Sequence, residues 1–187
     1  MKRNFLLILM LITTSISIHA QGNTFIKWGI CSSSYWGENS IGTSSKQGFM
    51  LGLAMDTPIG NSNFSVGPTF ELISKGGKLK TDDGYDIALN AVYLEVPLDL
   101  IYHIKINKEN SVSLAAGPYM AYGIGGNDGD TFDDRTGLDR MDAGLHFGLG
   151  YEYKRLLLNG SCDVGLKNVA INCPRNFAFI LSMGIKI

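Results

Sequence analysis

The stretch from 94 to 106, which reads LEVPLDLIYHIKI, decides the fold. Apolar residues occupy every second position of this stretch, and Glu95, Asp99 and Lys105 are among the residues that alternate with them. Successive side chains of a β-strand point to opposite faces, whereas a helix with 3.6 residues per turn would mix the two sets. The stretch therefore predicts a strand with one apolar face and one polar face.

The same alternation recurs along the rest of the chain. It is as clear at 141–154 and 177–187 as it is at 94–106. Weaker versions occupy five further segments, at 26–31, 48–56, 64–72, 112–124 and 156–167. Together these segments predict an all-β protein of eight strands.

The ionisable residues of these strands are sorted by face. All of them fall on the face opposite to the apolar one. A membrane-spanning barrel turns its apolar face to lipid, where a charge at the midplane costs roughly 2–4 kcal/mol. The residues predicted to face the interior are Lys27, Asp56, Glu71, Glu95, Asp99, His103, Lys105, Asp142, His146, Glu152, Lys154, Asp163, Lys167 and Lys186.

This sorting favours an eight-stranded, antiparallel, up-and-down transmembrane β-barrel. Eight strands leave an interior just wide enough for side chains. We therefore expect the inward acids and bases to pair into a polar, filled interior with a structural role. The alternative is a soluble, lipocalin-like ligand binder with its apolar face inside. Against it, the charged face is also rich in Gly, Ala and Ser, which suits a tight interior better than a solvated surface.

The predicted connections alternate between long and short. Outer-membrane barrels have long extracellular loops and short periplasmic turns, so this order agrees with eight strands and with both chain ends in the periplasm. Pro68, Pro97 and Pro118 lie inside predicted strands, where each removes a ladder hydrogen bond, and we expect bulges or local breaks there. The predicted connections are 36–46, 57–63, 75–90, 107–110, 125–140, 154–155 and 168–176.

The N-terminus reads as a cleavable secretory signal over residues 1–20, followed by the barrel domain at 21–187. Lys2 and Arg3 precede an apolar run at 5–12, and Ala20 closes the segment. A membrane-spanning helix needs about 20 apolar residues, which this run does not provide. The chain has a formal net charge of −1, which offers no basis for a nucleic-acid partner. Export through such a signal, with the barrel pattern, predicts the bacterial outer membrane.

Three cysteines, Cys31, Cys162 and Cys173, follow the predicted signal. An odd count leaves at least one thiol unpaired. We expect all three to be small buried or lipid-facing residues without a further role. A bridge between Cys162 and Cys173 is the alternative.

Four short motifs resemble the PorT-like outer-membrane β-barrel family of Bacteroidota. They are YLEVPL at 93–98, AGPY at 116–119, GLHFGLGYEY at 144–153 and GLKN at 165–168. The resemblance extends over about residues 22–187. It implies an eight-stranded outer-membrane barrel and little chemistry, because most members have no assigned activity.

The function we expect is that of a non-enzymatic barrel that stabilises the envelope or binds through its outer loops, without a wide pore. The expected partners are outer-membrane lipid or lipopolysaccharide and proteins that contact the loops. No catalytic residue, cofactor or metal ligand is predicted. A lipid-modifying enzyme stays open as an alternative if a serine lies within hydrogen-bonding reach of His103 or His146. Calcium binding by the acidic stretch at 128–140 is a weaker alternative to a solvated loop.

Overall fold

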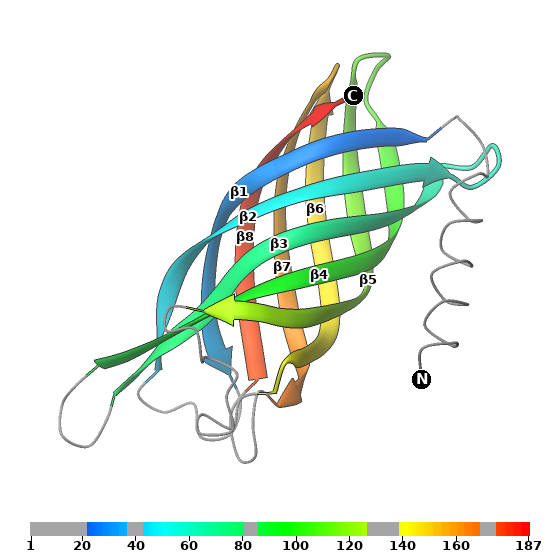
Figure 1. Cartoon of the computed structure of the whole chain (residues 1–187). Coiled ribbons are helices and arrows are strands. Elements are labelled where there is room, and N and C mark those ends of the chain that lie inside the picture. The colour runs from blue at the N-terminus through cyan, green and yellow to red at the C-terminus, as the bar shows by residue number, and fades with distance from the viewer. Residues whose placement is uncertain (1–21, 37–42, 81–85, 127–138, 169–174) are drawn as a thin grey trace.

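The computed structural model describes residues 22–36, 43–80, 86–126, 139–168 and 175–187. Eight antiparallel strands pair in chain order, and the last pairs with the first to close a barrel (Figure 1). The predicted fold class is therefore confirmed. The strands are β1 (Asn23–Trp36), β2 (Thr43–Pro58), β3 (Phe64–Lys80), β4 (Asp86–Lys105), β5 (Asn110–Gly126), β6 (Met141–Tyr153), β7 (Leu156–Asn168) and β8 (Arg175–Lys186).

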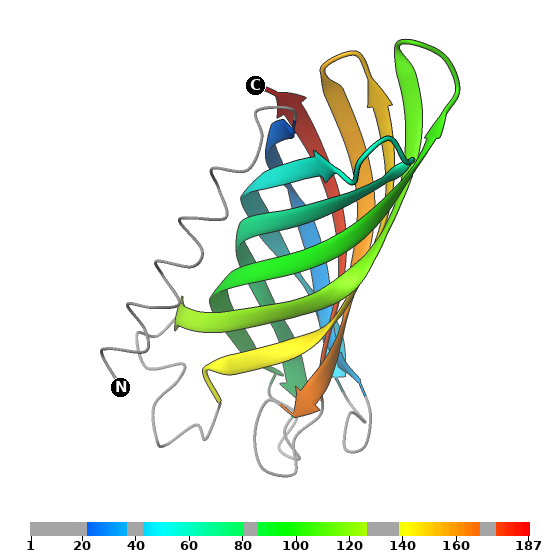
Figure 2. The same cartoon turned by 90° about the vertical axis from the view of Figure 1, so that its right-hand side faces the viewer.

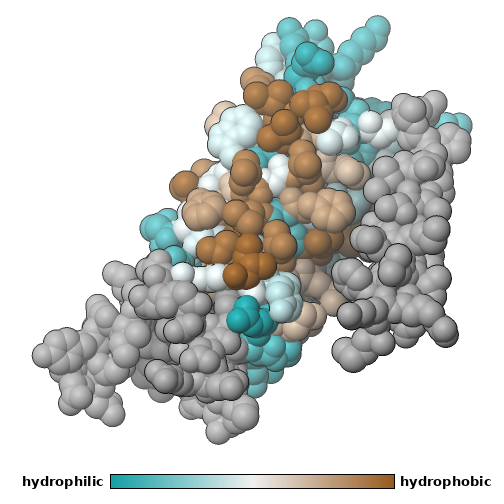
Figure 3. Space-filling view, in the orientation of Figure 1, coloured by the Kyte–Doolittle hydropathy of each residue, from teal (hydrophilic) through white to brown (hydrophobic). Residues whose placement is uncertain are grey.

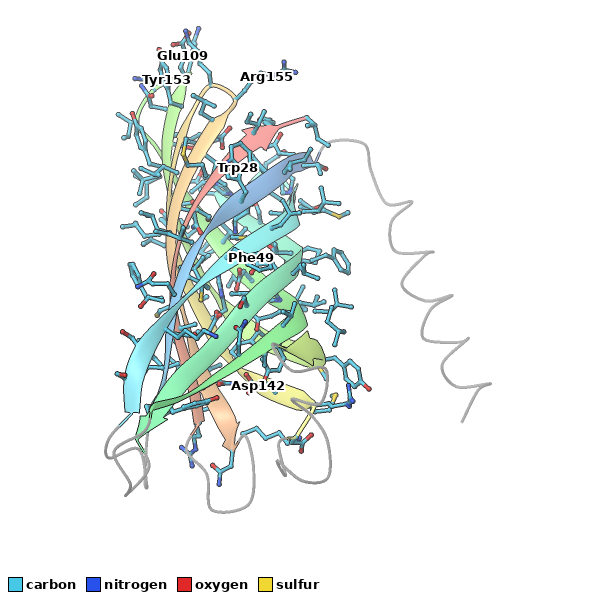
Figure 4. The ribbon with its side chains drawn as sticks, turned by 60° about the vertical axis from the view of Figure 1, so that its left-hand side comes forward. Trp28, Phe49, Glu109, Asp142, Tyr153 and Arg155 are labelled. Carbon is cyan, nitrogen blue, oxygen red and sulfur yellow. The ribbon has the colours of Figure 1, made fainter. Side chains whose placement is uncertain are left out.

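The two faces of the strands separate as the alternation predicts. On β1, Ile26 and Trp28 are 39% and 42% exposed, whereas Lys27 between them is 6% exposed. Apolar side chains gather across the outer surface of the barrel in Figure 3, and Trp28 and Phe49 project outward in Figure 4. Within the described residues, no helix has the length and apolar character needed to cross a membrane.

Most strands are longer than the sequence pattern predicts, and the difference matters most at β3 and β4. The pattern predicts a connection at 75–90, whereas β3 continues to Lys80 and β4 already begins at Asp86. The prediction stopped where the outward apolar residues stop, after Leu72. Because backbone hydrogen bonds do not depend on side-chain type, the ladder continues beyond that point, with Lys75 opposite Ala91.

The three mid-strand prolines interrupt pairing without shifting it. Pairing between β3 and β4 stops after Pro68 and resumes at Glu71 in the same register, and the ladders on either side have similar gaps. Local breaks are therefore present, but the bulges expected there lie elsewhere. The register shifts occur between Ser45 and Met50, between Val92 and Tyr93, and between Val164 and Asn168.

The short connections that the structure describes, 59–63, 106–109 and 154–155, all lie at one end of the barrel together with the C-terminus, and we call it the turn end. The β4–β5 and β6–β7 hairpins reach furthest there (Figure 2), with Glu109, Tyr153 and Arg155 at their tips (Figure 4). The opposite end is the loop end. The tight turns are built locally, since the Asn107 side chain accepts hydrogen bonds from the backbone N–H groups of Glu109 and Asn110.

Several sequence predictions fall outside the described residues. These are the signal peptide at 1–20, the acidic stretch up to residue 138 and Cys173. Cys31 is buried and Cys162 is half-buried, and both carry free thiols.

Candidate functional site

The centre of the interior is an ion pair network around Lys75. Its Nζ lies 2.8 Å from Asp163 Oδ2 and also pairs with Glu95, and these three side chains are at most 1% exposed. A buried charge without a partner is strongly destabilising. One lysine therefore holds two acids that arrive from β4 and β7.

Glu71 and Glu95 are directly opposite each other on β3 and β4. Like charges at such positions repel. Two lysines offset this repulsion, because Lys27 Nζ lies 3.5 Å from Glu71 Oε1 and Lys75 pairs with Glu95. Because Lys75 also pairs with Asp163, it links Glu95 of β4 to β7.

His146 connects this network to the turn end. Its Nδ1 lies 2.6 Å from Asp163 Oδ1, and its Nε2 lies 3.7 Å from Asp99 Oδ2. Gly117 of β5 lies between Asp99 and His146 in the ladder, and a Cβ there would clash with the backbone of Leu98. We call Lys27, Glu71, Lys75, Glu95, Asp99, His146 and Asp163 the central ion layer.

The loop end of the interior is packed with apolar and aromatic side chains. Tyr119 donates a hydrogen bond to Asp142 Oδ2 at 3.1 Å, and Asn176 donates a second to the same oxygen at 2.9 Å. Lys75 Nζ lies 4.5 Å above the Tyr119 ring, which joins this packing to the central ion layer. The buried cluster consists of Cys31, Met50, Ile73, Ala91, Tyr93, Tyr119, Ala121, Ala178 and Ile180.

The turn end of the interior is open. A cavity of about 200 Å³ lies at its mouth, and a smaller one of about 70 Å³ lies deeper, above the central ion layer. The two share Asp56, His103 and Glu152 as lining residues. We treat them as one turn-end cavity. The interior predicted to be filled is therefore filled at the centre and the loop end, and hollow at the turn end.

Most of the predicted interior residues lie where the alternation places them. His103, Glu152 and Lys186 are only half-buried near the turn end, and Lys186 Nζ lies 3.4 Å from Glu152 Oε1. The buried members are Lys27, Asp56, Glu71, Glu95, Asp99, Asp142, His146 and Asp163.

Three predicted interior lysines are exposed, and the interior placement was wrong for them. Lys105 lies at the mouth of the turn-end cavity. Lys154 stands in the two-residue β6–β7 turn with a positive φ of 56°, and its Nζ lies 3.5 Å from Glu109 Oε2. Lys167 lies at the loop-end rim, with its Nζ 2.6 Å from Asp139 Oδ2. Each has the parity of an inward residue but lies beyond the enclosed part of its strand.

The sequence prediction misses the central residue, Lys75, because the predicted connection at 75–90 includes it. The alternation could have found it. The inward positions of β3 continue from Glu71 through Ile73 to Lys75, all of them buried.

A serine does lie within hydrogen-bonding reach of a histidine. Ser65 Oγ is 3.0 Å from His103 Nε2, and Asp56 Oδ2 is 3.2 Å from the same nitrogen. In a catalytic triad the serine and the acid contact different ring nitrogens, so that the acid orients the base. Here both compete for one nitrogen, and Ser65 is only 3% exposed. The arrangement does not form a triad.

No group of three or more His, Cys, Asp or Glu side chains in the described ranges is arranged to hold a metal ion. Of the acidic stretch considered for calcium, Asp139 is described, and it pairs with Lys167.

A closed barrel with charged groups inside and uncharged apolar side chains outside defines an integral β-barrel membrane protein. The chain belongs to the outer membrane protein beta-barrel domain family, whose sequence profile matches residues 10–170. It is a small barrel of the bacterial outer membrane, and the soluble lipocalin-like alternative is wrong. This family is broader than the PorT-like one, which stays a prediction.

Similar solved structures include other outer-membrane proteins. Ail, the attachment invasion locus protein of Yersinia pestis, is 12% identical with a TM-score of 0.45, over 89% of this chain and 99% of that one. Neisserial surface protein A is 12% identical with a TM-score of 0.49, over 88% and 96%. The outer membrane protein AlkL is 14% identical with a TM-score of 0.48, over 89% and 90%. No curated protein matches the sequence.

Proposed function

We propose that this protein is a non-enzymatic, non-conducting barrel that supports the envelope and binds partners through its outer loops. The observation that carries the proposal is the closure of the interior. Lys75, Glu95 and Asp163 are at most 1% exposed, and Tyr119 packs against Lys75. An ion crossing the barrel would have to separate these buried pairs, which is strongly unfavourable.

Conductance measurements test the closed interior. We expect the folded full chain in a planar lipid bilayer to show no stable stepwise conductance. The matched comparison is Lys75→Ala, which removes the cation between Glu95 and Asp163, against Lys154→Ala at the exposed turn. A stable channel formed by the unmodified chain would reject the proposal.

Lipopolysaccharide and loop-binding proteins are the partners that we propose. The supporting feature is the exposed apolar belt, whose side chains need a lipid environment. We expect the chain to fold and resist heat better in membranes that contain lipopolysaccharide than in phospholipid alone. Equal stability in both membranes would count against a specific role for lipopolysaccharide.

The contact of Ser65 with His103 keeps one second candidate, a lipid-modifying enzyme. Because Asp56 and Ser65 meet the same nitrogen, we expect no phospholipid hydrolysis by the folded chain. A measured activity that is lost in Ser65→Ala would establish the enzyme and overturn the non-enzymatic proposal.

A further inference from the structure

Arg175 is the exception to the sorting of charge by face. It has the parity of Phe177 and Phe179, which face outward from β8. Every other charged residue of the strands whose side chain the structure describes has inward parity. A charge on the lipid face of a barrel costs roughly 2–4 kcal/mol at the bilayer midplane and about 0–1 kcal/mol near the interfaces. Arg175 is therefore expected at the level of the lipid headgroups.

The place of Arg175 in the fold agrees with that level. β8 begins at Arg175 and β1 ends at Trp36, both at the loop end (Figure 1). Toward the turn end, Phe177 and Phe179 follow on the same face and are 36% and 52% exposed. Because the short turns of such barrels face the periplasm, the loop end lies in the outer leaflet. Arg175 thus lies where the apolar belt of this leaflet ends.

Neighbouring strands hold the Arg175 guanidinium group in place. Arg175 is opposite Trp36 of β1 and opposite Asn168 of β7 in the two ladders. Its Cζ atom lies 5.4 Å from the centre of the Trp36 ring, and its Nε donates a hydrogen bond to Asn168 Oδ1 at 3.2 Å. The Trp36 ring is itself fixed, since its Nε1 donates to the backbone oxygen of Asn176 at 3.1 Å. The guanidinium is therefore oriented by the barrel wall.

The donors that remain free at this position suit a phosphate group. Among the described residues, the two Nη atoms of Arg175 and Nδ2 of Asn168 have no hydrogen-bond partner, and no carboxylate pairs with the arginine. A guanidinium group binds phosphate oxygens through two parallel hydrogen bonds. Lys167, next to Asn168, differs because it already pairs with Asp139 at 2.6 Å. Arg175 is therefore available to an external anion.

We propose that Trp36, Asn168 and Arg175 form a site for a phosphate group of lipid A, the membrane anchor of lipopolysaccharide. Arg175 binds the phosphate through its Nη atoms, and Asn168 Nδ2 adds a further donor. The acyl chains lie along Phe177 and Phe179, so a lipid covers apolar surface that a free phosphate leaves exposed. The site rests on the lipopolysaccharide partner proposed above and assigns it a position on the barrel.

Titration of the unmodified full chain tests the ligand. The folded chain is placed in phosphatidylcholine vesicles that contain lipid A, dephosphorylated lipid A or inorganic phosphate, and thermal unfolding is followed by heat-modified gel migration. We expect lipid A alone to raise the unfolding temperature. Equal stabilisation by both lipids would overturn the phosphate site while the lipopolysaccharide partner stands, and no stabilisation by either would reject that partner and the site together. Equal stabilisation by inorganic phosphate would overturn a lipid as the source.

Trp36 reports on the site directly. The chain has two tryptophans, so Trp28→Phe leaves Trp36 as the only fluorophore of its kind. In that background lipid A should shift the emission of Trp36, and dephosphorylated lipid A should not. Unchanged emission at lipid A contents that stabilise the barrel would place the phosphate elsewhere and overturn the site.

Arginine variants in the same background locate the phosphate. Arg175→Gln should raise the lipid A content needed for the emission shift at least about tenfold. Arg175→Lys keeps the charge without the planar fork and should fall between the two. Arg155→Gln, at the opposite end of the barrel (Figure 4), is the matched control and should change nothing. Heat-modified gel migration confirms folding of each variant, and a full response in folded Arg175→Gln overturns the site.

Discussion

The two ends of the barrel interior differ in how completely side chains fill them. At the loop end, Tyr93, Tyr119 and Ile180 fill the space and are at most 2% exposed. At the turn end, Ser113 and Ala115 line a cavity together with Asp56 and Asp99. The comparison teaches that one narrow barrel can be closely packed in one half while the other half keeps a cavity.

Replacing Lys75 by alanine is expected to have the largest effect, because the central ion layer separates the two halves. Glu95 and Asp163 would lose their shared cation while buried. The free energy of unfolding should fall by about 3–5 kcal/mol in denaturant titrations of the folded chain. The control, Lys154→Ala, breaks an exposed pair with Glu109 and should cost less than about 1 kcal/mol. Similar losses in both variants would contradict the central role of Lys75.

Alanine in place of two glycines contrasts a backbone clash with ordinary van der Waals contact. At Gly117 the added methyl group would meet the backbone of Leu98, so we expect a loss of about 1–3 kcal/mol in unfolding free energy. At Gly148 it would meet Ala115, Asn159 and His146 at 3.4–3.7 Å, which is ordinary contact, so a neutral change or a gain of up to about 1 kcal/mol is expected. Equal destabilisation at both sites would mean that the turn end is as tightly packed as the centre.

Replacing one alanine at each end of the interior by leucine compares the packing of the loop end with that of the turn end. Ala178 is completely buried in the loop-end cluster, and Ala178→Leu should cost about 1–3 kcal/mol by overpacking. Ala115→Leu should cost less than about 1 kcal/mol, since the new side chain enters the turn-end cavity. Thermal unfolding of both variants in one lipid composition is the measurement, and a more damaging Ala115→Leu would reverse the assignment.

The smallest effect is expected at the loop-end rim. A hydrogen bond from Lys167 lowers the pKa of Asp139 below its ordinary value, so the folded state favours the charged acid. A depressed pKa contributes stability above about pH 4, and that contribution is lost as the pH falls through the lowered pKa. Asp139→Asn should therefore remove less than about 1 kcal/mol near neutral pH and leave a flatter acid profile. An unchanged acid profile would show that the exposed pair contributes nothing.

Most of the fold could be predicted from the sequence, because period two assigns each residue of a strand to a face. The same signal does not give height along the barrel axis. Asp163 and Lys167 share a face of β7, yet one lies in the central ion layer and the other at the rim. The position of a residue along the barrel axis depends on the register between paired strands. The sequence of one strand does not determine that register. Lys75 was missed for a related reason, since β3 continues past its last outward apolar residue.

The cavity escaped prediction for another physical reason. Ser113, Ala115 and Gly148 are each ordinary inward residues of a narrow barrel. Ala115 lies opposite Gly148 because β5 pairs with β6 in this register. Two small residues therefore meet at the same position in the wall. The polarity of the interior can be predicted from each strand by itself. A cavity, in contrast, depends on which small residues neighbouring strands place side by side.

The three mid-strand prolines lie on a diagonal across three neighbouring strands of the barrel wall. Pro68 lies opposite Leu98, next to Pro97, and Pro97 lies opposite Tyr119, next to Pro118. Three neighbouring strands thus lack a ladder donor along one diagonal, while the strand registers on both sides stay unchanged. When lateral pressure in the surrounding bilayer changes, we expect the barrel wall to bend first along this diagonal of prolines. The backbone amide protons beside the prolines should then exchange with deuterium earlier than those in the rest of the wall.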